Sequence, residues 1–127
     1  MRLLLDTHTF LWFIGNDPRL SRRAKALLES DADLLLSVGS LWEIAIKLRI
    51  GNLRLAQPFD IFVAQQLADN EIELLPINLA HLGVVSALPL HHRDPFDRLL
   101  IAQAMIEQTP IVSADAAFDA YSVTRLW

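Results

Sequence analysis

The segment LLLDTHTFLW, residues 3–12, begins with three leucines and breaks off at Asp6. A short apolar run without alternation is typical of a strand that is buried on both faces of a parallel sheet. After the acid, Thr7 or Thr9 is expected to cap a short helix, and Gly15 is expected to end it. A strand that passes directly into a helix favours an α/β fold.

The alternation of strand and helix continues along the 127 residues. Pro76 favours an edge position for the strand that contains it. The sequence shows no internal repeat and no linker, so it predicts one α/β domain over residues 1–127. The remaining strands are predicted at 34–38, 73–77, 111–113 and 123–127, and the remaining helices at 21–29, 40–50, from Pro58 onward, 79–87 and 95–108.

Composition limits the class of protein. Hydrophobic residues make up 53% of the chain, and the absence of cysteine excludes both disulfides and thiolate metal sites. The N-terminal apolar run is too short for a signal peptide, and no run approaches the ~18 residues of a membrane span. We therefore expect a soluble, cytoplasmic protein with no membrane partner. The net charge of −4 disfavours nucleic acid, unless cations neutralise clustered acids.

Four acids fall where ligands bind in open parallel sheets, beyond the carboxyl ends of the strands. Asp6 ends the first strand and Asp115 follows the fourth, whereas Glu43 and Asp97 lie in first turns of predicted helices. Each alone has a capping explanation, such as a capping box of Ser40 with Glu43.

The four acids together point beyond capping. Asp97 differs from the other three, because its helix precedes its strand and simple alternation would put it at the opposite edge. The helix at 79–87 and the loop after it would have to bring the chain back. If the acids converge, charges ~4 Å apart repel by ~4 kcal/mol at an effective dielectric of 20, so the cluster needs a cation or raised pKa values.

An all-oxygen cluster suits Mg²⁺ or Mn²⁺, and such ions promote phosphodiester hydrolysis. The hypothesis gives Asp6 and Asp97 the role of main ligands. Glu43 would bind a second ion or orient the water, and Asp115 would complete the ring. Ser113 is expected to hydrogen-bond one of these acids.

The sequence also resembles a known family, the PIN-domain ribonucleases, and in particular the VapC-like toxins of bacterial toxin–antitoxin pairs. It differs at His8, where many relatives carry Asn. The resemblance rests on four segments in order: LLLDTHTFLWF (3–13), SLWEIAIKLRIGNLRL (40–55), LPLHHRDPFDRLLIAQA (88–104) and IVSADAAFDAY (111–121).

The resemblance implies a three-layer α/β/α fold whose parallel sheet has the order 3-2-1-4-5. It implies Mg²⁺- or Mn²⁺-dependent endonucleolytic cleavage of RNA, a homodimer, and a VapB-like antitoxin that covers or enters the site. The acids at the site would be Asp6, Glu43, Asp97 and Asp115. Asp94 would mainly cap the helix that begins at Pro95, and it would support the site together with Thr7 and Ser113.

Three other interpretations stay open. A receiver domain is disfavoured because the predicted third strand ends Leu75-Pro76-Ile77, without the acid that it requires. A PIN-like module that only binds a partner would not need four acids together. A DNA-directed nuclease remains possible on chemical grounds, since acids and a metal do not recognise the 2′-hydroxyl.

The remaining aromatic and histidine residues are given structural roles. Trp12, Trp42 and Trp127 are expected in the core or in a dimer interface. His91 and His92 lack helical metal-binding spacing and are predicted to lie in a loop at the rim of the site. His81 is predicted to be an ordinary helix residue.

Overall fold

The computed structural model describes residues 1–127 and has a five-stranded parallel sheet at its centre. The strand order β3-β2-β1-β4-β5 confirms the expected 3-2-1-4-5 arrangement, and β3 lies at an edge. Every neighbouring pair is parallel. The strands are β1 (Arg2–Leu5), β2 (Asp33–Ser37), β3 (Ile72–Leu75), β4 (Ile111–Val112) and β5 (Arg125–Leu126).

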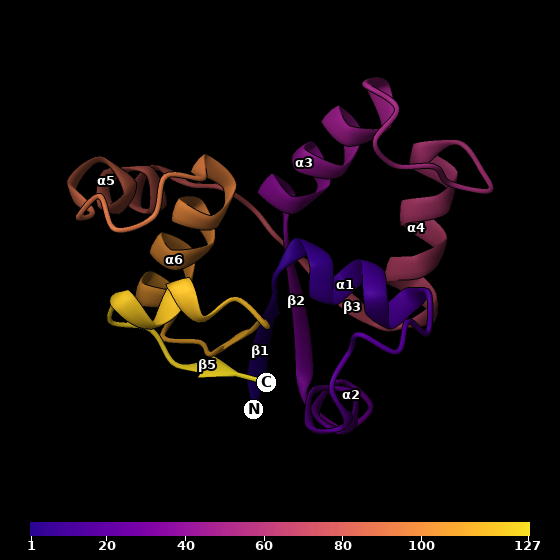
Figure 1. Ribbon diagram of the computed structural model, residues 1–127, viewed down its shortest axis with the longest axis horizontal. Coiled ribbons are helices and arrows are strands. Elements are labelled where there is room, and N and C mark those ends of the chain that lie inside the picture. The colour runs from indigo at the N-terminus through magenta and orange to yellow at the C-terminus, as the bar shows by residue number, and fades with distance from the viewer.

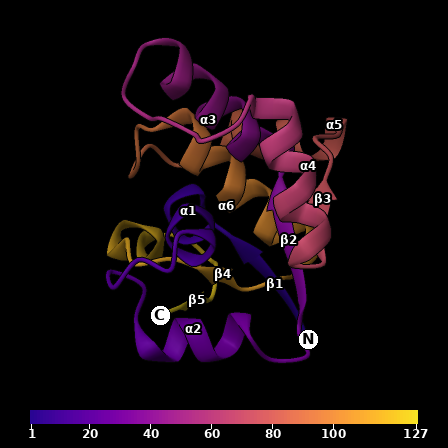
Figure 2. The same ribbon diagram turned by 90° about the vertical axis from the view of Figure 1, so that its right-hand side faces the viewer.

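Helices cover both faces of the sheet, which confirms the three-layer fold. In Figure 1, α5 and α6 lie on one side of the sheet and α1, α2 and α4 on the other. Figure 2, turned by 90°, shows α3 above the carboxyl edge of the sheet. The helices are α1 (Thr7–Ile14), α2 (Arg22–Leu28), α3 (Val38–Arg49), α4 (Phe59–Asp69), α5 (Leu79–Ala87), α6 (Pro95–Glu107) and the short 3₁₀ helix η1 (Ala116–Ala120).

The leucines of β1 connect the two halves of the core. Leu3 and Leu5 face one helical layer with Phe10, whereas Leu4 faces the other with Leu100, and all are essentially inaccessible to solvent. Because side chains alternate along a strand, three consecutive leucines supply both faces. This explains why the run is continuous rather than alternating.

The predicted start of the third helix is wrong. Ser37 caps α3, since its hydroxyl accepts the N–H of Gly39 at 3.0 Å. Ser40 is therefore buried inside the helix, and Glu43 lies in the second turn rather than in a capping box. Packing outweighed the local preference of the SLWE motif to begin a helix. The helix α3 crosses α6 so closely at Gly39 that a Cβ there would come within 2.4 Å of Leu99.

The position of α6 corrects the argument from alternation. A helix that connects two parallel strands runs antiparallel to them, so it begins at the carboxyl edge of the sheet. The first turn of α6 accordingly lies beside Asp6 and Asp115, and β4 begins shortly after its last turn. Simple alternation therefore already places Asp97 with the other acids, and the expected return of the chain through the helix at 79–87 is not needed to explain its position.

His81 is more than an ordinary helix residue. It is fully buried, and its Nδ1 accepts the N–H of Asn78 while the Asn78 side chain accepts the N–H of His81. Its Nε2 lies 3.2 Å from Glu107 Oε2. The imidazole thus caps α5 and joins it to the end of α6.

None of these helices is long and apolar enough to cross a membrane.

Candidate metal centre

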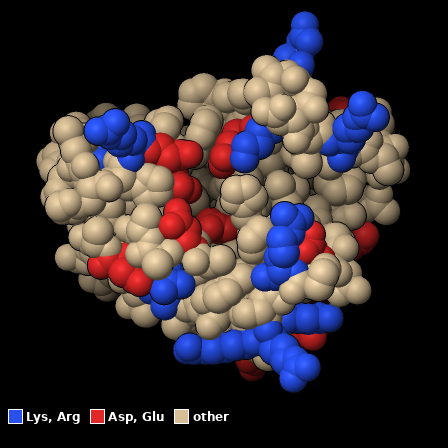
Figure 3. All heavy atoms as spheres, in the orientation of Figure 1, with Lys and Arg blue, Asp and Glu red and all other residues tan.

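A small acidic cleft lies at the carboxyl ends of β1 and β4. Its volume is about 100 Å³ and it has no hydrophobic lining. The four acids expected at the site meet there, and Figure 3 shows acidic side chains gathered in the central hollow of the molecule. The lining residues are Asp6, Thr7, His8, Glu43, Asp94, Asp97 and Asp115.

Asp6 is held rigidly at the base of the cleft. Its Oδ1 accepts the N–H of Thr9 at 2.7 Å, so Asp6 itself caps α1, and the prediction of Thr7 or Thr9 as the cap was wrong. Its Oδ2 accepts the hydroxyl of Ser113. Thr9 donates its own hydroxyl to the Val112 carbonyl at 2.8 Å, which ties the start of α1 to β4.

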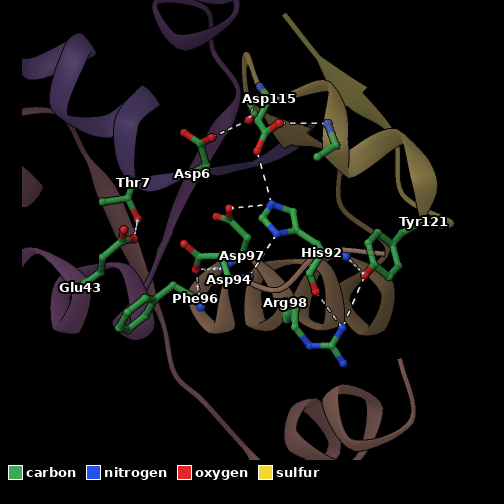
Figure 4. Close-up of polar contacts among 12 residues, drawn as sticks. Asp6, Thr7, Glu43, His92, Asp94, Phe96, Asp97, Arg98, Asp115 and Tyr121 are labelled. Atoms are coloured by element: carbon green, nitrogen blue, oxygen red, sulfur yellow. Dashed lines mark hydrogen bonds and ion pairs between the residues drawn. The ribbon is translucent and has the colours of Figure 1, made fainter. Parts of the chain in front are cut away.

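Ser113 connects two acids of the cleft although it lies beneath the lining. While donating to Asp6, its Oγ accepts the N–H of Asp115 at 3.0 Å. Asp115 in turn caps η1, accepting the N–H of Ala117 at 2.9 Å. The cap leaves the second carboxylate oxygen of Asp115 facing the cleft (Figure 4).

The DPFD segment performs two tasks. Asp94 Oδ1 accepts the N–H groups of Phe96 at 2.8 Å and Asp97 at 3.2 Å, and Pro95 occupies the first helical position, where no N–H is needed. Asp94 therefore fixes the start of α6. Asp97 projects from that first turn into the cleft.

Glu43 reaches the cleft from α3. Its Oε1 accepts the Thr7 hydroxyl at 2.7 Å, and its Oε2 lies 2.9 Å from the Lys47 ammonium one turn later. Lys47 therefore partly neutralises the charge of Glu43. The contact with Thr7 joins α3 to α1 and sets the position of the carboxylate.

His92 lies in the loop at the rim of the site, as predicted, but its contacts with two of the acids were not predicted. Its Nε2 lies 3.0 Å from Asp97 Oδ2 and 3.4 Å from Asp115 Oδ2. Its Nδ1 accepts the N–H of Asp94 at 3.2 Å, which places the ring proton on Nε2 as the donor to both carboxylates. The spacing of residues in the sequence did not indicate this role, because His92 meets Asp115, 23 residues later, only in the folded chain.

Two further residues missed at the sequence level hold the loop that carries His92. Arg98 donates its guanidinium to main-chain carbonyls of the loop and of the last turn of α5 at 2.9–3.2 Å. The Tyr121 hydroxyl donates to Pro89 at 2.7 Å and accepts the N–H of His92 at 2.8 Å. Figure 4 shows Arg98 and Tyr121 on the side of His92 away from Asp6. The carbonyl acceptors of Arg98 belong to Val85, Leu88, Pro89 and His92.

The electrostatics of the cleft centre on Asp97. Burial is the main cause that raises the pKa of Asp97 to about 7, and the carboxylates of Asp94, Asp6 and Glu43 raise it further, against an opposing effect of His92. The cluster thus holds more negative charge than its surroundings compensate.

The residues present fit a hard divalent cation. The donors that converge are carboxylate oxygens, which suit Mg²⁺ or Mn²⁺. Ligand atoms of Asp97, Asp115 and His92 lie within 4.8 Å of one another. Since Nε2 of His92 carries a proton, the carboxylates rather than the imidazole offer free lone pairs.

Comparisons with known proteins place these observations in a family. No curated protein gives a significant sequence match. The chain is similar in structure to VapBC2 from Rickettsia felis bound to a DNA fragment from its promoter, with a TM-score of 0.75 and 14% identity over 99% of this chain and 98% of that chain. It is also similar to FitAcB from Neisseria gonorrhoeae, with a TM-score of 0.67 and 20% identity over 98% and 96% of the two chains.

A third similar structure is VapBC-1 from nontypeable Haemophilus influenzae, with a TM-score of 0.66 and 14% identity over 99% of this chain and 97% of that chain. At these identities the likeness concerns the fold. The sequence itself matches the family model of the PIN domain over residues 3–123. Nearly the whole chain, including all four acids of the cleft, lies within that match, and the chain belongs to the PIN domain family.

Proposed function

We propose that this protein is a Mg²⁺- or Mn²⁺-dependent endoribonuclease and the toxin of a toxin–antitoxin pair. The observation that carries the proposal is the acidic cleft, where carboxylates from four separate parts of the fold meet and the pKa of Asp97 is raised to about 7. PIN-domain toxins are generally nucleases. The preference for RNA rests on the family resemblance.

In this proposal Asp6 and Asp97 hold the ion, and Asp115 completes the ring of acids. A divalent ion at this site would neutralise charge on the scissile phosphate and lower the pKa of a bound water. Hydrolysis joins the water oxygen to phosphorus and breaks one P–O ester bond, and the leaving oxygen takes up a proton. Glu43, oriented by Thr7, would position the water or hold a second ion.

The residues around the acids would set their geometry. Ser113 fixes Asp6 and the main chain of Asp115, and Asp94 fixes the turn that presents Asp97. His92 donates to Asp97 and Asp115 and so limits their movement. Partners of this kind commonly change metal affinity or activity by about 10–100-fold when they are removed.

Cleavage of total cellular RNA tests the proposal. The purified protein should make discrete cuts with Mg²⁺ or Mn²⁺, and the cuts should disappear with EDTA and in Asp6→Asn. Single-stranded DNA should be cut far more slowly under the same conditions. Equal cutting of DNA would favour a DNA-directed nuclease, and no cutting by a folded, metal-binding protein would favour a module that only binds a partner.

A VapB-like antitoxin is the proposed protein partner. The similar solved structures are those of VapBC and Fit complexes, and one is described as a toxin–antitoxin complex from Klebsiella pneumoniae. We propose that the antitoxin covers or enters the acidic cleft.

A single PIN-like domain over residues 1–127 and a cytoplasmic location, where the RNA substrate would be found, complete the proposal.

We further propose a homodimer that forms through α3. One face of this helix exposes Val38, Trp42, Ile46 and Ile50 at four-residue intervals, so they form a continuous apolar stripe. Trp42 is 63% exposed and packs edge-to-face on Phe96, with the two ring centroids 5.4 Å apart. It is therefore not a core residue, whereas Trp12 and Trp127 pack together at 5.9 Å against the core.

Replacing Trp42 with Arg should convert this dimer to monomers. A buried aromatic anchor contributes about 2 kcal/mol or more to an interface, so the dissociation constant should rise at least about 30-fold. Sedimentation equilibrium measures it. Leu79→Arg is the matched control, because Leu79 is 85% exposed on α5 and lies outside the stripe. A monomeric wild-type protein, or a dimer that tolerates Trp42→Arg, would contradict the proposal.

A further inference from the structure

A larger pocket lies next to the acidic cleft. It has a volume of about 510 Å³ and is bounded by α1, by the C-terminal half of α3 and by the segment that follows α3. His8 lines both the pocket and the cleft. Lys47 lines the pocket while its ammonium contacts Glu43 of the cleft. The two hollows therefore share a wall at His8.

The pocket differs from the cleft in its charge. Its lining contains the cations Arg19, Lys47 and Arg54 and a single acid, Asp17. Asp17 is already paired with Arg19 at 2.7 Å, and that arginine holds the pKa of the carboxyl at about 2. Arg54 is exposed and forms no hydrogen bond or ion pair within the chain. An acidic cleft for cations thus borders a pocket whose cations outnumber its acids and in which Arg54 is unpaired.

Flat side chains line the same pocket. The guanidinium carbon of Arg19 lies 5.0 Å from the ring centroid of Trp12, and the exposed imidazole of His8 lies 5.7 Å from it with the planes 30° apart. Such planar groups stack on nucleic acid bases without regard to sequence. Asn52 adds a side-chain amide that makes no hydrogen bond within the chain and could meet the edge of a base.

We propose that this pocket binds the nucleotide of a single-stranded RNA substrate next to the phosphate that is cleaved. The base would stack against Trp12, His8 and Arg19, and Arg54 and Lys47 would contact the backbone phosphate. The inference rests on the proposed function. Charge favours this occupant, because the pocket offers cations to an anionic chain whose next phosphate would lie in the metal cleft.

Two variants and a matched control test the pocket. Arg54→Gln removes one free cation, and Trp12→Leu removes a stacking surface, with circular dichroism to confirm that the fold is kept. Arg23→Gln is the control, because Arg23 is exposed on α2 and lines neither hollow. Fluorescence anisotropy with a short fluorescein-labelled single-stranded RNA, in Ca²⁺ to limit cleavage, measures binding. Cleavage of the same RNA in Mn²⁺ gives KM and kcat.

We expect each pocket variant to weaken RNA binding and raise KM about tenfold, with kcat within about twofold of wild type. The control should match wild type. Equal RNA affinity in wild type, both pocket variants and the control would overturn the inference. This holds also if the pocket variants weaken the binding of an antitoxin while their RNA affinity is unchanged. If wild type binds RNA through the pocket but does not cut it, the subsite stands and the proposed function fails. If wild type cuts RNA and both pocket variants bind and cut it equally well, the proposed function stands and the subsite fails.

Discussion

Asp97→Asn should lower metal-dependent RNA cleavage about a thousandfold or more, while making the metal-free protein more stable at neutral pH. The loss of activity follows from the loss of a main ligand, since charge stabilisation by a metal ion supplies several kcal/mol to the transition state. The gain in stability has a separate cause. Burial and neighbouring carboxylates make the ionised form of Asp97 unfavourable in the folded protein.

The pH dependence of this effect has a definite sign. The pKa of Asp97 rises from its usual value of 3.8 to about 7 on folding. The native state therefore binds the proton more tightly than the unfolded chain does, and this contribution to stability is complete below about pH 4 and lost as pH rises through about 7. Asparagine carries no charge, so the variant does not lose stability in that range.

Thermal unfolding in EDTA, between about pH 5 and pH 8, measures this difference. The melting temperature of wild type should fall more over this range than that of Asp97→Asn, and Mn²⁺ should restore it in wild type alone. Asp31→Asn, at an exposed position outside the cleft, is the matched control. A variant that keeps its nuclease activity, or that follows the wild-type pH profile in EDTA, would rule out this role for Asp97.

Arg98→Met should destabilise the protein by about 3 kcal/mol. The guanidinium donates to four main-chain carbonyls, and a charged donor contributes about 1.5–3 kcal/mol per bond before exposure reduces the value. Methionine keeps the aliphatic stem but leaves the Leu88 and His92 carbonyls without a donor, whereas Val85 and Pro89 keep the Leu88 N–H and the Tyr121 hydroxyl. The loop would then hold His92 and Asp94 less firmly, so activity should fall as well.

Urea unfolding at a fixed metal concentration gives the change in the free energy of unfolding. Arg93→Met is the control, since Arg93 is exposed in the same loop and makes no hydrogen bond or ion pair. Tyr121→Phe removes only the hydroxyl contacts and should cost less than Arg98→Met. If Arg98→Met and Arg93→Met unfold at the same urea concentration, the loop does not depend on the guanidinium.

Helix starts show how far local reasoning reaches. The Asp94 cap, the start of α2 near residue 21 and the bounds of α5 follow from residues within one turn, and the sequence predicted them correctly. The start of α3 did not follow from local preference. Its SLWE motif resembles a capping box, but the close crossing of α6 requires Gly39 inside the helix, and Ser37 then becomes the cap.

The sequence by itself indicated the parallel sheet and the four acids that line the cleft. Continuous apolar runs depend on near neighbours along the chain, and Asp6 and Asp115 come directly after two such runs. The sequence indicated that Ser113 would contact one of these acids, but only the tertiary structure decided which group holds which acid. Ser113 reaches Asp6 across 107 residues, Thr7 reaches Glu43 across 36, and His92 reaches Asp115 across 23. Such contacts produce no periodic pattern in the sequence, because they form only after the core has brought distant segments to one edge of the sheet.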